Sequence, residues 1–120
     1  MRIPLPARLI AAAGFFLMVA TLFVGGSQPE AAGMFDAHWD KLAHFAYFGA
    51  MTALLLVALN MRTPVLAFVV VAAIGAADEL AQAQLPGRHA DLADLATDVV
   101  AAVVVLTALM LLRRHLKSRT

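Results

Sequence analysis

The residues best able to do chemistry stand in three short stretches of an otherwise apolar sequence. They are Asp40, Lys41 and His44, then Asp78, Glu79 and Gln82, and finally Arg88, Asp91, Asp94 and Asp98. An imidazole or a carboxylate can act as a general base, so His44 and Glu79 are the candidate catalytic residues. The guanidinium of Arg88 can hold a carboxylate through two hydrogen bonds or stabilise a developing oxyanion. The chain has no cysteine, which excludes a thiolate nucleophile, a disulfide framework and a zinc-thiolate site.

Helical spacing would place these residues in sets that share one face of a helix, because positions three or four apart are neighbours there. The sets are Asp40 with His44, Asp78 with Gln82, and Asp91 with Asp94 and Asp98. In the first set, Asp40 would fix the tautomer of His44 and raise its basicity. A lone histidine in an apolar helix can equally donate a hydrogen bond to a neighbouring helix. The sequence leaves both interpretations open for His44.

A metal site is the weaker interpretation of the same residues. Asp40, His44, Glu79 and Asp94 have side chains that can bind a metal ion. The H-E-x-x-H spacing that marks one recognised class of zinc site is absent. We therefore expect no metal and no cofactor.

Three of the carboxylates also have purely structural interpretations near helix starts. Asp40 and Asp91 stand where a side chain could cap a helix N-terminus. Asp94 would lie in the first turn of a helix, where the helix dipole favours a negative charge by about 0.3–1 kcal/mol. For these three residues, capping or dipole stabilisation carries at least as much weight as function.

Asp78 and Glu79 are harder to explain as local structure. They stand near the predicted end of a helix, where the same dipole opposes a negative charge. A structural ion pair of Glu79 with Arg88 or Lys41 is the alternative to a functional role. We favour the functional role for Glu79.

The composition indicates that lipid is the solvent for most of the chain. Of its 120 residues, 62% are hydrophobic and 14% are charged, whereas soluble domains average about 45–50% and about 25%. A chain of this length forms a single domain, 1–120. The basic residues lie outside the apolar runs and form no patch, which argues against nucleic acid as a partner.

The apolar runs predict an all-α fold, because crossing a bilayer takes about 20 helical residues. We expect an integral membrane bundle of four transmembrane helices at about 8–26, 41–61, 64–84 and 92–112, followed by a basic cytoplasmic tail at 113–120. The third and fourth apolar runs are too short to span the bilayer unaided. The third helix must therefore continue through Asp78 and Glu79, and the fourth must include Asp94 and Asp98.

The distribution of basic residues predicts the orientation of the bundle. Seven of the nine lysines and arginines lie in the N-terminal segment, at Arg62 and in the C-terminal segment. Basic segments tend to stay in the cytoplasm, which predicts an N-in/C-in topology. The first helix resembles a signal peptide, but its apolar run of 18 residues is longer than the usual 7–15, so we expect it to be retained.

The alternation of four helices would bring the polar residues together at the other end of the bundle, outside the cytoplasm. The second helix begins, the third ends and the fourth begins at that end. An ionisable side chain in the middle of the bilayer costs at least about 2.5–3.5 kcal/mol, so such groups turn inward and pair. Carboxylates outnumber the two cations and the histidine. We therefore expect some of the surplus carboxylates to be protonated or to bind a cationic partner.

The order and spacing of these residues resemble the VanZ-like family. Its pattern is D-K-x-x-H at the start of one membrane helix, E-x-x-Q near the end of the next, then P-G-R, and two acidic or amide residues four positions apart. The matching residues here are Asp40, Lys41 and His44, then Glu79 and Gln82, then Pro86, Gly87 and Arg88, and finally Asp94 and Asp98. One departure is Ala101, which stands where the family usually has glycine.

The resemblance implies a small multi-pass protein of the bacterial inner membrane, in a family with one member linked to glycopeptide, and in particular teicoplanin, resistance. The leading hypothesis is that the polar cluster binds a polar or charged ligand, such as a lipid head group or a cell-wall precursor. The alternatives are an intramembrane hydrolase or transferase with His44 or Glu79 as the base, and a structural scaffold. Because four short helices must shield several charges from lipid, a homo-oligomer is a further expectation.

Overall fold

Four α-helices make up most of this protein in a computed structural model, which describes residues 2–27 and 37–120. They are α1 (Leu5–Gly26), α2 (Ala37–Ala58), α3 (Pro64–Ala83) and α4 (Leu92–Ser118). All four are long and apolar enough to cross a membrane, and the described residues include no strand. The prediction of an all-α bundle of four membrane helices is therefore confirmed, whereas the N-in/C-in orientation stays a prediction.

The helix boundaries differ from the predicted ones at the start of α1, at both ends of α2 and at the end of α4, and by one residue at the end of α3. Helix α1 begins at Leu5, three residues early, because a proline within its first turn suits a helix start. Helix α2 spans Ala37–Ala58 instead of 41–61, because Asn60 and Met61 adopt φ angles of 58°, which are incompatible with a continuing helix. Helix α4 continues to Ser118, so most of the segment predicted as a tail is helical. Arginine, leucine and lysine are good helix formers, which explains this extension.

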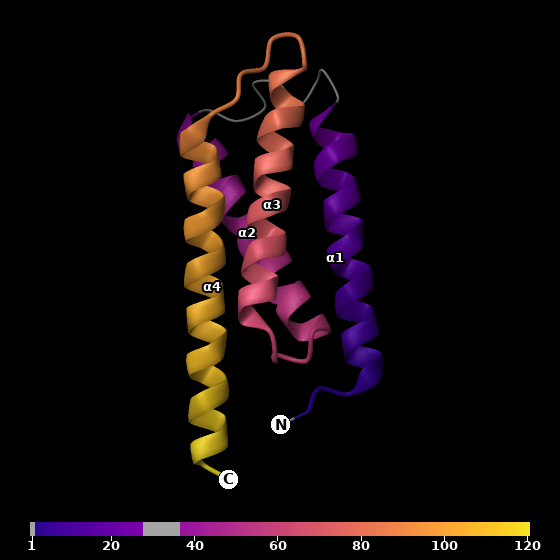
Figure 1. The fold of residues 1–120 in the computed structure, drawn as a ribbon, viewed down its shortest axis with the longest axis vertical. Helices are drawn as coiled ribbons and strands as arrows, with labels where there is room; N and C mark the ends of the chain where they lie inside the picture. Colours follow the sequence, from indigo (N-terminus) through magenta and orange to yellow (C-terminus); the bar gives the residue numbers. More distant parts are fainter. Residues whose placement is uncertain (1, 28–36) are drawn as a thin grey trace.

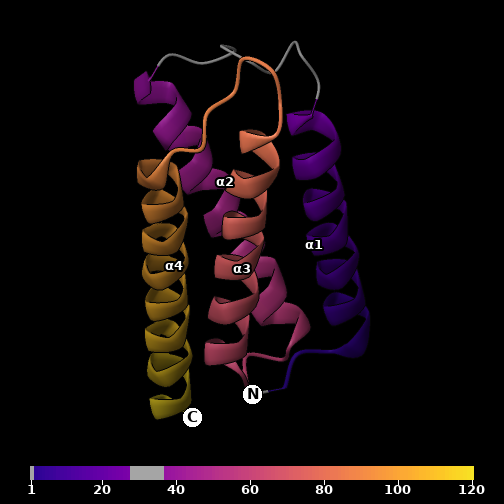
Figure 2. The same ribbon diagram turned by 45° about the horizontal axis from the view of Figure 1, so that its top comes forward.

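The helices run alternately up and down, and α2 packs against each of the other three (Figure 1). The turned view shows α2 behind α3, with α1 and α4 on opposite sides (Figure 2). Both chain ends lie at one end of the bundle (Figure 1). The opposite end holds the start of α2, the end of α3 and the start of α4, where the polar stretches of the sequence fall.

The core runs along the length of α2 and lies where small residues let the helices approach. Phe48 and Met51 are fully buried there, together with Val71 of α3 and Ala101 of α4. A Cβ atom on Gly49 would lie 3.2 Å from a side-chain atom of Val105, so glycine allows α2 and α4 to pack closely. Ala101 fits at its position although the family usually has glycine there.

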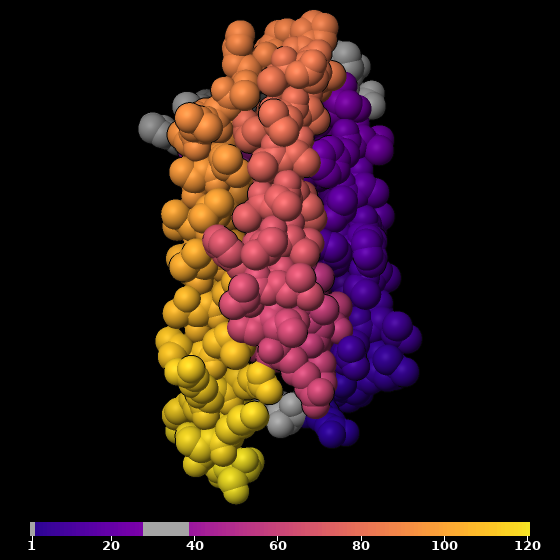
Figure 3. Space-filling model, viewed as in Figure 1, coloured from indigo at the N-terminus to yellow at the C-terminus, as the bar shows by residue number. Residues whose placement is uncertain are grey.

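The outer surface of the bundle is apolar on the sides of the helices. Large hydrophobic side chains are exposed along all four helices, as expected where they face lipid. The space-filling view shows the C-terminal part of α4, in yellow, extending beyond the other helices (Figure 3). Residues 113–118 of that part are helical and carry Arg113, Arg114 and Lys117.

At the end of the bundle that carries the termini, polar side chains satisfy the backbone where α2 ends. The Oδ1 atom of Asn60 accepts a hydrogen bond of 2.8 Å from the N–H of Ile3. The side chain of Arg8 donates to the carbonyl of Ala58 at 3.0 Å, and Arg113 donates to the carbonyl of Met61. These bonds fasten α1 and α4 to the end of α2, since the last carbonyls of a helix have no partner within it.

Candidate functional site

The polar residues predicted from the sequence gather where α2 begins, α3 ends and α4 begins. Helix α2 supplies Asp40, Lys41 and His44; helix α3 supplies Asp78, Glu79 and Gln82; the connection to α4 and its first turns supply Arg88, Asp91, Asp94 and Asp98. Asp78, Glu79, Asp94 and Asp98 are all buried, with 1–6% of their surface exposed. The cluster is therefore part of the packed bundle.

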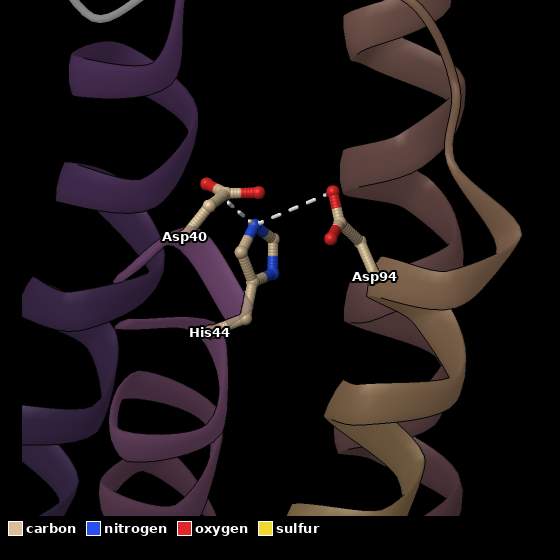
Figure 4. A group of neighbouring side chains, drawn as sticks. All are labelled: Asp40, His44 and Asp94. Carbon is tan, nitrogen blue, oxygen red and sulfur yellow. Dashed lines mark ion pairs between the residues drawn. The ribbon is translucent and has the colours of Figure 1, made fainter. Parts of the chain in front are cut away.

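His44 lies at the centre of the cluster, between carboxylates from two helices. Its Nδ1 atom lies 2.9 Å from Oδ1 of Asp98, and a carboxylate accepts hydrogen bonds, so Nδ1 is the donor. Its Nε2 atom faces the other way, 3.8 Å from Oδ2 of Asp94 and 4.0 Å from Oδ1 of Asp40. Figure 4 shows the imidazole between these two carboxylates, one on α2 and one on α4.

Of the two interpretations that the sequence left open for His44, the one in which Asp40 fixes its tautomer is not supported by the geometry. The separation of 4.0 Å between Nε2 and the Asp40 carboxylate is too long for a hydrogen bond. Asp98, which lies on the neighbouring helix α4, fixes the tautomer instead. The alternative interpretation, in which His44 donates to another helix, is the one that the geometry supports.

Lys41 links the start of α2 to the start of α4. Its Nζ atom donates to Oδ2 of Asp91 at 2.9 Å and also to Oδ1 of Asp94. The Asp91 side chain in addition accepts a hydrogen bond of 2.8 Å from the N–H of Ala93. Asp91 lies before the membrane-spanning part of α4, and the hydrogen bond from Lys41, followed by that from Ala93, lowers the pKa of its carboxyl.

The predicted capping roles have different outcomes at the two candidate positions. Asp91 is the N-cap of α4, because its side chain accepts from the second residue of the helix. Asp40 is not a cap, since α2 already begins at Ala37 and Asp40 lies in its first turn. Asp94 lies in the first turn of α4, where the helix dipole favours its charge.

Glu79 joins the end of α3 to the start of α4. Its Oε2 atom accepts a hydrogen bond of 2.8 Å from the backbone N–H of Asp91. The alternative ion pair of Glu79 with Arg88 or Lys41 does not form among the described residues. Asp78 and Gln82 meet as their spacing predicts, with Nε2 of Gln82 donating to Asp78 at 3.0 Å.

Three buried polar atoms in this cluster have no hydrogen-bond partner among the described residues. They are Oε1 of Glu79, Oδ2 of Asp98 and Nη2 of Arg88. An unpaired buried polar group costs about 1–3 kcal/mol, and more when it is charged, so folded proteins seldom leave one without a reason. The cluster therefore has both acceptor and donor capacity that its own residues do not use.

A cavity of about 370 Å³ opens beside the cluster, between α1, α2 and α3. One part of its wall is polar and comprises Asp40, His44, Asp78, Gln82 and Arg88. The other part is mainly apolar or small and comprises Thr21, Leu22, Gly25, Gly26, Ala43, Tyr47 and Phe48. A Cβ atom on Gly25 or Gly26 would meet nothing within 4 Å, so the α1 wall is open there.

Sequence reasoning missed the contribution of α1 to the site and that of Tyr47 on α2, which contacts it. The hydroxyl of Tyr47 donates to the carbonyl of Met18 at 2.6 Å and lies 2.5 Å from the hydroxyl of Thr21. These contacts hold the last part of α1 against α2 beside the cavity. Tyr47 follows His44 by three positions and so shares its helix face, a signal that would have placed it at the site.

Comparisons with known proteins identify a single family. The sequence model of a family described as VanZ/LLP1 matches residues 6–113. The match includes every residue of the cluster and most of the four helices. No curated protein and no solved structure matches the chain.

Proposed function

The chain belongs to the VanZ/LLP1 family, and from this premise we propose that it is a protein of the bacterial inner membrane that binds a phosphorylated lipid in the cavity at its polar end. The motif resemblance that suggested this family is confirmed, and four helices make the protein a multi-pass membrane protein. The lipid-linked ligand and its binding are our proposal.

The observation that carries the proposal is the two-part wall of the cavity. Arg88 lines the polar part, and its Nη2 atom is buried without a partner among the described residues. A guanidinium is the side chain best suited to hold a phosphate group, because its donors match phosphate oxygens in pairs. A phosphate group in the cavity would give this donor its acceptor.

The carboxylates on the same wall indicate what else the head group carries. Asp40 and Asp78 line the cavity together with Arg88. Carboxylates accept hydrogen bonds from hydroxyl and amino groups and repel a bare phosphate. The ligand should therefore have hydroxyl or amino groups beside its phosphate, as in sugar-linked or amine-containing lipid head groups, including lipid-linked cell-wall precursors.

The apolar part of the wall suits the chain of such a lipid. Leu22, Tyr47 and Phe48 contribute to it, and Gly25 and Gly26 leave space on the α1 side. A lipid chain would enter this part of the cavity laterally from the bilayer, without passing through the polar end of the bundle.

The side of the membrane follows from the distribution of basic residues and is part of the proposal. Arg8, Arg113 and Arg114 lie at the end of the bundle opposite the cavity. The tendency of basic segments to stay in the cytoplasm would place the cavity on the cell-envelope side. A role in resistance to glycopeptide antibiotics, which act at that side, is one use of such binding that the family suggests.

Binding to the purified full-length protein in detergent tests the proposal. Native mass spectrometry and a titration with fluorescent lipids would compare polyprenyl phosphate, its sugar-linked form, phosphatidylethanolamine and a neutral diacylglycerol. We expect the phosphorylated lipids to bind and the diacylglycerol not to bind. Arg88→Gln should weaken phospholipid binding at least tenfold, about 1.4 kcal/mol.

Arg114→Gln is the matched control, because Arg114 is an exposed arginine at the end of the bundle opposite the cavity. It should bind as the wild type does. Size-exclusion chromatography and circular dichroism establish that both variants are folded. Equal binding by wild type and folded Arg88→Gln, or equal binding of the diacylglycerol, would refute the proposal.

A second candidate function is favoured by the contact between His44 and Asp98. An imidazole that lines a cavity and whose Nδ1 donates to a carboxylate has the arrangement of a general base and its orienting group. The corresponding activity is hydrolysis of, or transfer from, the head group bound in the cavity. Incubation of the purified protein with phosphorylated lipids tests it, and turnover should be lost in His44→Gln. No turnover in wild type would leave binding alone as the function.

A further inference from the structure

The Nε2 side of His44 has the geometry of a metal-binding site. Nε2 lies 4.0 Å from Oδ1 of Asp40 and 3.8 Å from Oδ2 of Asp94, and one ligand atom from each residue lies within 4.8 Å of the others (Figure 4). These separations are too long for hydrogen bonds. Bonds from a metal ion to nitrogen and oxygen ligands measure about 2.0–2.2 Å, so two ligands of one ion lie roughly 3–4 Å apart. The three side chains therefore converge at the spacing of shared ligands.

The hydrogen bond on the other side of the ring prepares Nε2 for this role. Because Nδ1 donates to Asp98 at 2.9 Å, a neutral His44 presents its lone pair at Nε2. That lone pair faces two carboxylates, and either a proton on Nε2 or a metal ion shared by the three side chains relieves the repulsion. Histidines that bind metals commonly donate their other N–H to a carboxylate, as His44 does to Asp98.

Lys41 does not occupy Oδ2 of Asp94, the oxygen that would bind the ion. Its Nζ atom donates to Oδ1 of Asp94, whereas Oδ2 of Asp94 is the atom that faces His44. The side chain of Asp94 is 9% exposed and that of Asp40 is 40% exposed. Asp94 is thus fixed within the bundle, whereas Asp40 borders the cavity, through which an ion could reach the site.

Two unpartnered carboxylate oxygens next to His44 show that the cluster has acceptor capacity that its own residues do not use. Glu79 and Asp98 are 6% and 1% exposed, and each leaves one carboxylate oxygen without a hydrogen-bond partner among the described residues. With His44 they form a second set in which one ligand atom from each residue lies within 4.8 Å of the others. Because Asp98 contacts the Nδ1 side of His44, an ion on the Nε2 side would not touch these oxygens, but it would reduce the negative charge of the cluster as a whole.

We propose that His44, Asp40 and Asp94 bind a divalent transition-metal cation of the Zn²⁺ or Mn²⁺ type. Imidazole favours transition metals over Mg²⁺ and Ca²⁺, and the two carboxylates make Mn²⁺ acceptable beside Zn²⁺. Asp98 orients the imidazole without binding the ion. The three ligands leave at least one coordination position, and Asp40 and His44 both line the cavity, so that position faces it. The site stands on geometry separate from Arg88 and does not depend on lipid binding.

Metal titration of the purified full-length protein, with any affinity tag removed and bound metal stripped by a chelator, tests the proposal. Zn²⁺ binding would be followed by calorimetry, and Mn²⁺ binding by electron paramagnetic resonance, without added lipid. We expect one equivalent of either ion per chain and much weaker binding of Mg²⁺. His44→Ala and Asp94→Asn should each lower the affinity at least tenfold, and Asp98→Asn should lower it about 10–100-fold.

Two controls separate this site from other sources of metal binding. His89→Ala removes an exposed histidine near the same end of the bundle and should leave binding unchanged. Arg88→Gln should also retain it, so failure of the lipid proposal and failure of the metal proposal are distinguishable. Asp40 is partly exposed, so Asp40→Asn should fold even if the variants of buried residues do not. This variant should weaken metal binding.

The proposal is overturned if the folded wild type is less than half occupied by both Zn²⁺ and Mn²⁺ at about 100 µM free ion, which corresponds to a Kd weaker than about 100 µM. It is equally overturned if Asp40→Asn binds as tightly as the wild type. Broadening of the His44 ring signals by Mn²⁺ in a nuclear magnetic resonance spectrum of the wild type, with much weaker broadening of those of His115 near the far end of α4, would support it directly.

Discussion

His44 and Asp98 join α2 and α4 through a hydrogen bond of 2.9 Å between Nδ1 and Oδ1, deep in the polar end of the bundle. Asp98 is 1% exposed, so neither water nor lipid can replace this partner. Removing one member of a buried pair leaves the other group unpaired, which costs about 3–5 kcal/mol, whereas replacing both with apolar residues is often neutral or stabilising.

We therefore expect His44→Leu to lower the free energy of unfolding by about 3–5 kcal/mol. The double variant His44→Leu with Asp98→Leu should recover most of this loss. Reversible unfolding in mixed detergent micelles measures both. A double variant no more stable than His44→Leu would mean that the hydrogen bond does not account for the effect.

The ion pair between Lys41 and Asp91 should give Asp91 a distinctive titration. Its pKa is lowered below the ordinary value of 3.8, first by the hydrogen bond from Lys41 and then by that from Ala93. A carboxyl whose pKa is lower in the folded state stabilises the fold above its unfolded-state pKa and loses that contribution as the pH falls through the folded-state pKa. The stabilisation by Asp91 is thus complete at neutral pH and is lost only below about pH 4.

Carbon-13 chemical shifts of the Asp91 carboxyl, followed against pH, measure this directly. We expect a midpoint below 3.8 in the wild type. Lys41→Met should move the midpoint upward, because it removes the first cause of the shift. An unchanged midpoint in Lys41→Met would contradict the assignment.

Gly25 offers a way to fill the proposed lipid site without disturbing the bundle. It lines the cavity, and a Cβ atom there would meet nothing within 4 Å. Gly25→Leu should therefore fold normally and gain slightly in helix stability, by up to about 1 kcal/mol. Its affinity for phosphorylated lipids should fall at least tenfold. Undiminished binding would place the lipid chain elsewhere.

Asn60 should be a stability determinant at the opposite end of the bundle. It adopts a φ angle of 58°, which asparagine tolerates better than most residues, and its side chain accepts the N–H of Ile3 at 2.8 Å. Asn60→Ala loses both features and should lower stability by about 1–3 kcal/mol. Asn60→Gly restores only the backbone freedom and should fall between alanine and wild type. Thermal unfolding monitored by circular dichroism ranks the three proteins.

The absence of cysteine makes the orientation directly testable. His89 lies in the connection between α3 and α4, and Ser118 is the last residue of α4. In spheroplasts, a maleimide that cannot cross membranes should label His89→Cys, whereas it should reach Ser118→Cys only after permeabilisation. The reverse pattern would place the polar end in the cytoplasm.

Much of the fold could be predicted because bilayer thickness sets a length that each apolar run must meet. That requirement placed Asp78 and Asp94 inside membrane helices, as found. The end of α2 was missed because the left-handed backbone at Asn60 and Met61 occurs within an apolar run and leaves no mark in the hydrophobic pattern. The helical continuation to Ser118 was missed because a change from apolar to basic residues marks a membrane boundary and does not by itself end a helix.

The assignment of partners within the polar cluster could be predicted only in part. Spacing along one helix correctly paired Asp78 with Gln82. It also paired Asp40 with His44, yet the closer partner is Asp98. Partners on different helices depend on how each helix is rotated about its axis, and packing details affect that rotation, such as the absence of a Cβ atom at Gly75, where one would lie 3.2 Å from the Asp98 carboxylate. Residue spacing carries no information about it.

The order of the helices along the chain has a consequence for biosynthesis. Helix α2 carries Lys41 and His44, whereas the carboxylates that they contact across the bundle, Asp91, Asp94 and Asp98, come from α4 and the residue before it. Because the ribosome makes α2 first, the ammonium and the imidazole enter the membrane before the acidic segments leave the translocon. When Asp91, Asp94 and Asp98 follow, Lys41 and His44 are therefore already present as their partners.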